Sequence, residues 1–206
     1  MQKTRVLIAD DHAIVRIGLA ALLNAKSDIE VVGQAKDGRT AVTETLRLNP
    51  DVVIMDLMMP IMDGTAATAE ITARRPGVKV IILTTFSTSD GIKHALDAGA
   101  VGALMKNEET DSLVDAIRKV SKGETVISPD VEALIRQDPP AAKLTPKQSK
   151  VLESLIRGLT NKDIAKILGI TEGSVEEHVN AIFIKLGAAN RTEAVAIALR
   201  KHLLKI

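Results

Sequence analysis

The residues best suited to chemistry stand where short apolar segments end. A run of four apolar residues leads directly into Asp56, and an earlier apolar segment ends in Asp10 and Asp11. Two later segments end in Thr84 and in Lys106. Such runs predict buried parallel strands, whose carboxyl ends lie at one edge of a sheet. The sequence therefore predicts three carboxylates, a hydroxyl and an ammonium group in one place.

Three clustered carboxylates repel one another, and a divalent cation that joins them removes this cost. Oxygen ligands with access to solvent favour Mg²⁺, which accepts few protein ligands and keeps several waters. Beside such a cation, Asp56 is suited to attack a phosphoryl group and form an acyl phosphate, and Lys106 to stabilise charge on the transferring oxygens. Two alternatives stay open: Asp56 could cap the next helix, and Lys106 could be an ordinary surface lysine at a strand end.

The elements that position these groups alternate over residues 1–122. The expected strands are 5–10, 29–35, 51–56, 79–84 and 101–105, and the expected helices are 12–24, 38–48, 64–74, 88–98 and 109–121. Strands that alternate with helices of this length predict right-handed crossovers and a parallel sheet. The turn residues Pro50, Asp63-Gly64, Pro76-Gly77 and Gly99 stand at the expected joins. The first domain is therefore expected to be an α/β domain over residues 1–122.

The pattern lapses over residues 123–143, which leave room for one short helix before the adjacent prolines Pro139 and Pro140. Adjacent prolines favour extended, semi-stiff backbone, so this segment is expected to be an interdomain linker. Residues 144–206 then form an all-α domain, with helices that start near 146 and 161 and two more over 172–186 and 191–204. Capping boxes open its first two helices, and Gly169 lies in the short turn that predicts a helix-turn-helix.

Composition bounds the classes of function. The chain has 206 residues, no cysteine and only two aromatic residues, Phe86 and Phe183. Disulfides and thiol chemistry are excluded, and binding by stacking on bases is disfavoured. No apolar run approaches the length needed to span a bilayer, so a soluble, cytoplasmic protein is expected. Residues 144–206 carry 10 Lys or Arg against 6 Asp or Glu, an excess typical of a nucleic-acid-binding module.

The order Asp10-Asp11, Asp56, Thr84 and Lys106 at successive strand ends resembles the receiver domain of two-component response regulators. The C-terminal third is similar to the output domain of NarL/FixJ/LuxR regulators. Its matching segments are Leu144-Thr145-Pro146, Gly158-Leu159-Thr160-Asn161-Lys162-Asp163-Ile164-Ala165, Lys185-Leu186-Gly187 and Asn190-Arg191-Thr192-Glu193-Ala194. The resemblance implies a flavodoxin-like, doubly wound sheet of five parallel strands in the order 2-1-3-4-5, followed by a four-helix helix-turn-helix domain.

The resemblance also implies roles in the receiver. Asp11 and Asp56 would bind Mg²⁺ directly together with the backbone carbonyl of Met58, and Asp10 would bind mainly through water. A sensor histidine kinase would phosphorylate Asp56, and Thr84 would hydrogen-bond the new phosphoryl group and draw the following loop inward.

The receiver part of the chain departs from the family in two places. Ala103 stands where many receivers couple an aromatic side chain to the switch, and Asn107 stands where the wider family often has proline. The rotating-aromatic switch is therefore not expected. Phe86 could replace it or could be ordinary packing. Met58 and Phe86 also flank the approach of a hydrolytic water in receivers, and neither can orient water, so slow loss of the phosphoryl group is expected.

In the output domain, the family assigns base contacts to the third helix. Its outward residues are Glu176, Glu177, Asn180 and Ala181, and the position of Glu176 is usually lysine in the family. The two glutamates could accept hydrogen bonds from cytosine or could simply lie on a solvated face. His178 could contact phosphate or pack in a half-buried position. Better phosphate candidates lie at helix ends: Lys162, Lys185 and Arg191.

The leading hypothesis is a phosphorylation-controlled transcription regulator, not an enzyme, that dimerises and binds paired half-sites on double-stranded DNA. In helix 191–204, Ala194, Ala198 and Leu199 are expected to face the core, which leaves Val195 and Leu203 spare. This spare apolar face could be a dimer contact or could pack against the receiver. One alternative is a signalling adaptor whose output domain binds a protein instead of DNA. A second, a haloacid-dehalogenase-like phosphatase, would need an aspartate two residues after the nucleophile, where Met58 stands.

Overall fold

The computed structural model describes residues 3–85, 89–137, 144–201 and 203. The chain divides into two compact units, Met1–Asp138 and Pro139–Ile206. Within the described ranges, no helix has both the length and the apolar character needed to cross a membrane.

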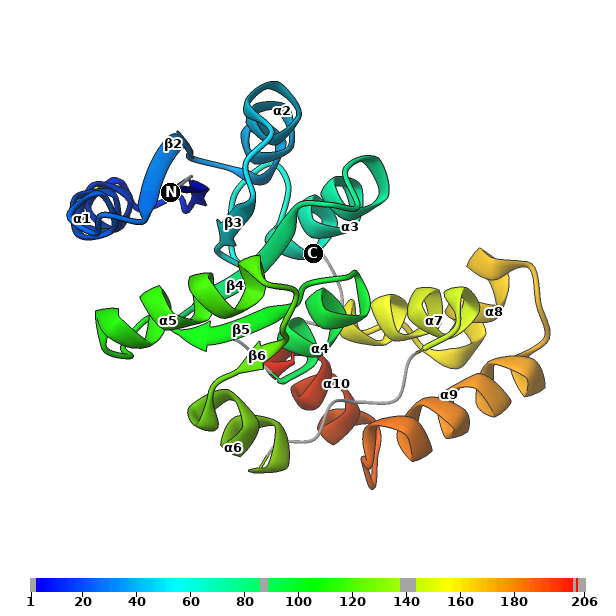
Figure 1. The fold of residues 1–206 in the computed structure, drawn as a ribbon. Helices are drawn as coiled ribbons and strands as arrows, with labels where there is room; N and C mark the ends of the chain where they lie inside the picture. The colour runs from blue at the N-terminus through cyan, green and yellow to red at the C-terminus, as the bar shows by residue number, and fades with distance from the viewer. Residues whose placement is uncertain (1–2, 86–88, 138–143, 202, 204–206) are drawn as a thin grey trace. The chain divides into compact units, whose positions relative to one another are not determined.

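The first unit is built on six parallel strands in the order β2-β1-β3-β4-β5-β6 (Figure 1). The strands are β1 (Thr4–Ala9), β2 (Ile29–Ala35), β3 (Val52–Met55), β4 (Lys79–Thr84), β5 (Gly102–Met105) and β6 (Val126–Ile127). Five helices connect them: α1 (Ala13–Asn24), α2 (Gly38–Leu48), α3 (Gly64–Arg74), α4 (Ser89–Asp97) and α5 (Thr110–Ser121). The predicted order of the first five strands, 2-1-3-4-5, is confirmed.

The inner strands are mostly apolar because both faces of the sheet are covered, whereas the edge strand β2 exposes Glu30 and Gln34. Along β1, Val6 and Ile8 pack with α1 and α5, whereas Leu7 and Ala9 pack with α2, α3 and α4. Successive side chains of a strand point to opposite faces, so each strand supplies both cores in turn. This double burial leaves only the ends of the inner strands free for polar side chains.

Residues 123–137, expected to belong to a linker, add two elements to the first unit. β6 pairs with β5 through Gly102 and Ala103, and the N–H of Ser128 donates to the carbonyl of Ala103 at 3.0 Å. The helix α6 (Pro129–Gln137) then places Val131, which is fully buried, in the core beside α4. A two-residue strand has no periodicity, which is why the sequence pattern did not predict it.

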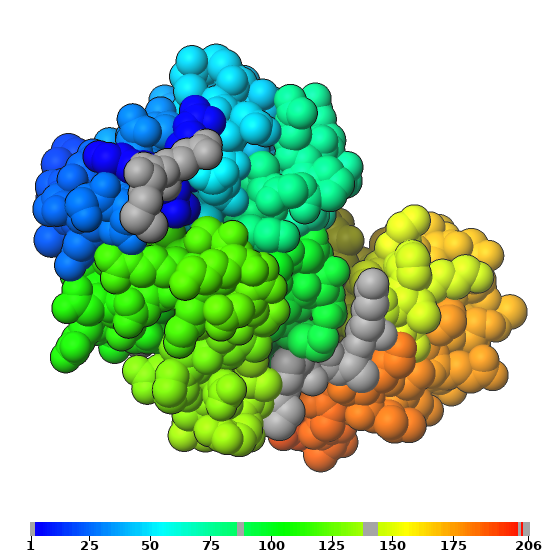
Figure 2. All heavy atoms as spheres, viewed as in Figure 1, coloured from blue at the N-terminus to red at the C-terminus, as the bar shows by residue number. Residues whose placement is uncertain are grey.

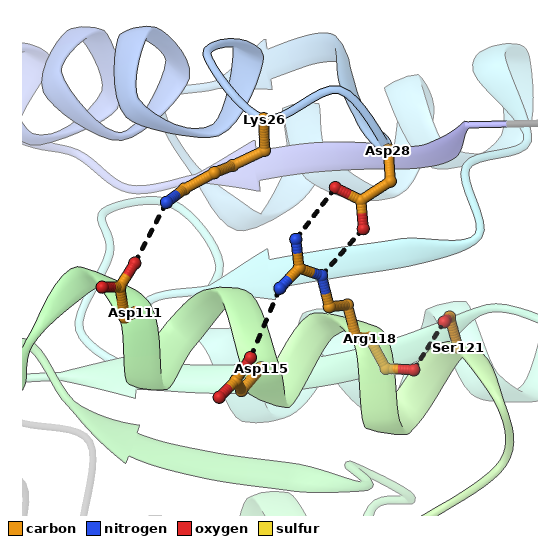
Figure 3. Close-up of polar contacts among 6 residues, drawn as sticks. All are labelled: Lys26, Asp28, Asp111, Asp115, Arg118 and Ser121. Atoms are coloured by element: carbon orange, nitrogen blue, oxygen red, sulfur yellow. Dashed lines mark hydrogen bonds and ion pairs between the residues drawn. The ribbon is translucent and has the colours of Figure 1, made fainter.

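Ion pairs connect α5 to the loop that follows α1 (Figure 3). Arg118 donates to both carboxylate oxygens of Asp28, at 2.7 and 3.0 Å, and Lys26 lies 3.0 Å from Asp111. The hydrogen bond from Arg118 is the main cause that lowers the pKa of Asp28. Because α1 follows Asp11 and α5 follows the loop after Lys106, these pairs help to hold two elements that border the strand ends.

The second unit contains α7 (Pro146–Ile156), α8 (Asn161–Leu168), α9 (Glu172–Leu186) and α10 (Arg191–Arg200). Both predicted capping boxes are present, at the starts of α7 and α8. Gly169 ends α8 in a left-handed conformation with φ 65°, and Thr171 caps α9, so α8 and α9 form the predicted helix-turn-helix.

The apolar face of α10 differs from the expectation. Ala194 and Ala198 are buried as expected, but Leu199 is 46% exposed, whereas Val195 and Leu203 pack against the core. The exposed apolar residue of this helix is therefore Leu199.

Candidate functional site

Asp56 lies one residue beyond β3, where its backbone still follows the sheet. Its N–H donates to the carbonyl of Ala9 at 2.8 Å, which holds it beside the end of β1. The backbone at Gly64 packs directly against the backbone of Asp56: a Cβ on Gly64 would lie 2.1 Å from the Asp56 carbonyl oxygen. Only glycine allows that approach. Asp63, and not Asp56, caps α3 by accepting from the N–H of Ala66, so the capping alternative for Asp56 is wrong.

Lys106 is shared between two buried carboxylates. Its Nζ lies 2.6 Å from Oδ2 of Asp10 and 2.9 Å from Oδ2 of Asp56. The side chains of all three residues are less than a tenth exposed: 8% for Lys106, 3% for Asp10 and 6% for Asp56. A snorkelling surface lysine is therefore excluded. The ammonium group of Lys106 therefore compensates the negative charges of both Asp10 and Asp56.

Burial and charge act against each other on these groups. Burial raises the pKa of Asp56 more than the hydrogen bond and charge of Lys106 lower it, and the nearby Asp10 raises it further. For Lys106, burial lowers the pKa, but hydrogen bonds and attraction from Asp10 and Asp56 together outweigh burial and raise it. Lys106 is thus held as a cation, and ionised Asp56 is costly unless a further positive charge arrives.

Asp11 completes the acidic cluster at its solvent side. Its side chain is 34% exposed, and ligand atoms of Asp10, Asp11, His12 and Asp56 all lie within 4.8 Å of one another. Three clustered carboxylates, of which Asp11 is open to water, fit a hard divalent cation. His12 was not singled out from the sequence, because its proximity to the carboxylates depends on how the loop after β1 turns.

The remaining receiver residues lie around this cluster. Thr84 is buried at the end of β4, next to β3 in the sheet, and the N–H of Lys106 donates to its carbonyl at 2.7 Å. Met58 is 57% exposed, so it does not extend the core. Ala103 is fully buried in β5. Phe86 lies outside the described residues.

The predicted base-contact residues lie on one outward face of α9, which forms part of the surface of the second unit (Figure 2). Glu176, Glu177 and Asn180 are exposed, and His178 and Ala181 are partly buried. One further residue was missed: Ile184, which follows Ala181 at helical spacing, is 82% exposed. An exposed isoleucine on this face could contact a thymine methyl group.

The predicted phosphate contacts are not equivalent. Lys162 is exposed in the first turn of α8. Lys185 instead donates to Oε1 of Gln148 at 2.9 Å, and Arg191 donates to the carbonyls of Leu155 and Leu159 at 3.0 and 2.7 Å. Arg191 therefore satisfies carbonyl groups at and after the end of α7, a structural role that the sequence did not predict.

Comparisons with known proteins agree with this geometry. Residues 6–118 match the family described as "Response regulator receiver domain", and residues 142–198 match "Bacterial regulatory proteins, luxR family". The "Transcriptional regulatory protein LiaR" of Bacillus subtilis is 39% identical over 97% of this chain and 98% of its own length.

Two solved structures of RcsB are also similar. The structure of "two RcsB dimers bound to two parallel DNAs" is 26% identical, with a TM-score of 0.71 over 97% of this chain and 99% of that chain. RcsB from Salmonella enterica serovar Typhimurium, bound to promoter P1flhDC with the phosphomimetic BeF3⁻, is 26% identical, with a TM-score of 0.72 over the same shares of both chains.

Proposed function

We propose, because this chain belongs to the two-component response regulators with a DNA-binding LuxR-type output domain, that a sensor histidine kinase phosphorylates Asp56 and thereby controls DNA binding. The observation that carries this proposal is the buried pairing of Lys106 with both Asp10 and Asp56. Response regulators are not catalytic enzymes. We also propose a cytoplasmic location, because double-stranded DNA is the proposed partner.

The carboxylate of Asp56 acts as the nucleophile. One of its oxygens forms a bond to phosphorus, the bond from phosphorus to the donor nitrogen of the kinase histidine breaks, and the electron pair of that bond returns to the histidine. Lys106 then exchanges its contact with the free carboxylate for one with a phosphoryl oxygen. Because Asp10 already holds Lys106 at 2.6 Å, the ammonium group is positioned before transfer begins.

A Mg²⁺ ion fits the residues present, because its preferred ligands are oxygens with access to water. Asp11, Asp56 and the carbonyl of Met58 would hold it, with Asp10 contributing through water. When bound, it supplies the positive charge that the desolvated carboxylates lack and neutralises the incoming phosphoryl group.

The switch runs through Thr84. Its hydroxyl, buried at the end of β4, is proposed to donate to the phosphoryl oxygen and to shift the loop before α4. With Ala103 in β5, no aromatic side chain at that position can report the change. The signal then requires only that the receiver face near α4 has two alternative packings and that phosphorylation changes their relative populations.

Phosphorylation is proposed to pair two receivers. The largest exposed apolar residues of α1 are Ile14, Ile17 and Leu22, at 86%, 65% and 46% exposure. Ile14 and Leu22 also line a cavity of about 240 Å³ between α1 and α5, and Lys106 lines another part of it. A projecting apolar row next to a hollow on the same surface is self-complementary about a two-fold axis, which suits a second copy of this chain.

Paired output domains would then read two half-sites. α9 is proposed to enter the major groove, with Glu176, Glu177, Asn180 and Ala181 toward the bases and Lys162 at the phosphates. The adaptor alternative keeps one supporting observation: the two glutamates are exposed on this face, whereas Arg191 is engaged inside its own unit.

The test is selection of bound duplexes from a random DNA pool, with and without an acyl-phosphate donor. We expect a paired motif that is enriched by the donor in the parent and not in Asp56→Asn, which keeps the shape and removes the nucleophile. Asp130→Asn, an exposed aspartate of α6, is the matched control. If Asp56→Asn and the parent take up equal amounts of labelled phosphate from the donor, Asp56 is not the phosphorylation site. If no DNA motif is recovered, the adaptor alternative is favoured.

A further inference from the structure

His12 occupies the N-cap of α1 but does not cap it. Its backbone is extended, with φ −81° and ψ 108°, and its side chain makes no capping hydrogen bond. Ser, Thr, Asp and Asn are the residues that stabilise a helix start at this position. Helix stability therefore does not explain a histidine here.

The imidazole turns toward the acidic cluster. Its Nδ1 lies 2.7 Å from Oδ1 of Asp11 and 3.4 Å from Oδ1 of Asp10. The backbone holds this position, because the N–H of His12 donates to Oδ1 of Asp10 at 2.8 Å. A ring nitrogen of His12 also belongs to the set of ligand atoms, shared with Asp56, that lie within 4.8 Å of one another.

These separations are close to those of a coordination shell. Opposite donors at about 2.1 Å from a six-coordinate ion lie about 4.2 Å apart. The limit of 4.8 Å exceeds the separation of opposite donors by about 0.6 Å and that of adjacent donors, about 3.0 Å, by about 1.8 Å, so the side chains surround one ion after approaching by at most about 2 Å. His12 has the freedom to do so, because its side chain is 70% exposed.

We propose that His12 is a protein ligand of the receiver's divalent-cation site, through Nδ1, and that it favours later transition-metal ions such as Zn²⁺ over Mg²⁺ at this site. This inference rests on the proposed cation site and deepens it. Magnesium takes oxygen ligands, whereas an imidazole nitrogen adds affinity for the later first-row metals. When Nδ1 binds the ion, the proton of the neutral ring resides on Nε2, and this N–H can donate a hydrogen bond to solvent.

The test uses the full-length protein with Mn²⁺ or Zn²⁺ alone. Pulsed electron paramagnetic resonance of the Mn²⁺ form detects coupling to a ligand ¹⁴N, which we expect in the parent and not in His12→Ala or His12→Gln. The matched control is His94→Ala, an exposed histidine of α4, which should keep the coupling. By calorimetry, both His12 variants should bind Zn²⁺ at least about tenfold more weakly and Mg²⁺ within about twofold of the parent.

Two results would overturn the inference: ¹⁴N coupling that persists in His12→Ala, or its absence from the parent. Asp11→Asn separates this failure from failure of the cation site itself. If Asp11→Asn weakens Mg²⁺ binding while the His12 variants match the parent for Zn²⁺, the cation site stands and His12 is no ligand. If Asp11→Asn leaves Mg²⁺ affinity unchanged, the cation site and this inference both fail.

Discussion

Replacing Lys106 with methionine tests the electrostatics of the receiver site most directly. Lys106→Met keeps a long apolar stem and removes the ammonium group that lies 2.6 Å from Asp10 and 2.9 Å from Asp56. Two buried carboxylates then lack their shared cation. In the absence of Mg²⁺, we expect the free energy of unfolding of the first unit to fall.

The expected decrease in the free energy of unfolding has a lower and an upper limit. Removing one partner of a buried pair costs about 3–5 kcal/mol. The cluster can relieve itself by protonating Asp56, whose ordinary pKa is 3.8. Each pH unit above that value costs about 1.4 kcal/mol, so protonation limits the loss to roughly 4 kcal/mol near pH 7 and about 2 kcal/mol near pH 5. We therefore expect a loss of about 3–4 kcal/mol near neutral pH.

The pH dependence follows from the raised pKa of Asp56. A carboxyl group whose pKa is higher in the folded state binds its proton more tightly there, so its ionisation destabilises the fold as pH rises above the ordinary value. The loss in Lys106→Met should therefore grow between pH 5 and pH 7. Mg²⁺ should stabilise the variant more than the parent, because it replaces the missing charge.

Amide hydrogen exchange of β1, β3 and β4, measured in EDTA and in Mg²⁺, reports the stability of the first unit alone. Lys122→Met, which removes an exposed lysine, is the matched control and should leave exchange unchanged. A loss below about 1 kcal/mol, typical of exposed pairs, would refute the reasoning. So would a loss that does not change with pH.

Four further predictions concern the other surfaces. Glu176→Lys should bind arbitrary duplex more tightly and steepen the slope of log K against log salt by about 0.9. Met58→Asn should shorten the lifetime of the acyl phosphate, measured by label retention in Mg²⁺ buffer, if Met58 obstructs the hydrolytic water. Arg191→Met should destabilise the second unit by about 1–3 kcal/mol in urea unfolding, because it leaves carbonyls unsatisfied. The double change Ile14→Asp and Ile17→Asp should abolish donor-dependent dimers in analytical ultracentrifugation.

Each of these has an outcome that would contradict it. An unchanged salt slope in Glu176→Lys, with Glu124→Lys as the control, would place α9 away from DNA. Parental decay of label in Met58→Asn would show that this side chain does not shield the phosphorus. Parental stability of Arg191→Met would leave this arginine available for phosphate. Persisting dimers in the α1 variant, with loss in Leu199→Asp, would move the interface to α10.

The alternation of strands and helices, and the residues at the strand ends, were predictable from local patterns in the sequence. Apolar runs, turn residues and capping boxes are local signals, so a strand that ends at or next to Asp56 and a helix that starts near residue 161 could be predicted without contacts. Parallel pairing then brings the strand ends together in any doubly wound sheet. For this reason the acidic cluster could be predicted before its geometry was known.

Other features were decided only by tertiary structure. β6 is too short to show a pattern and exists because β5 offers it a free edge. The exposed side of α10 depends on which of its residues pack against the other helices, and Leu199 lies outside that contact. The role of Arg191 depends on carbonyls 32 and 36 residues earlier in the chain.

The receiver site shows the same division. Sequence spacing placed Lys106 near the carboxylates, but its contacts with both Asp10 and Asp56 depend on how parallel strands bring their ends together. The direction of the His12 side chain depends on how the loop after β1 turns. Local propensity depends on neighbours within a few residues, whereas a charge responds to every group that folding brings within a few ångströms. Residue types were therefore predictable from the chain, and their pairing was not.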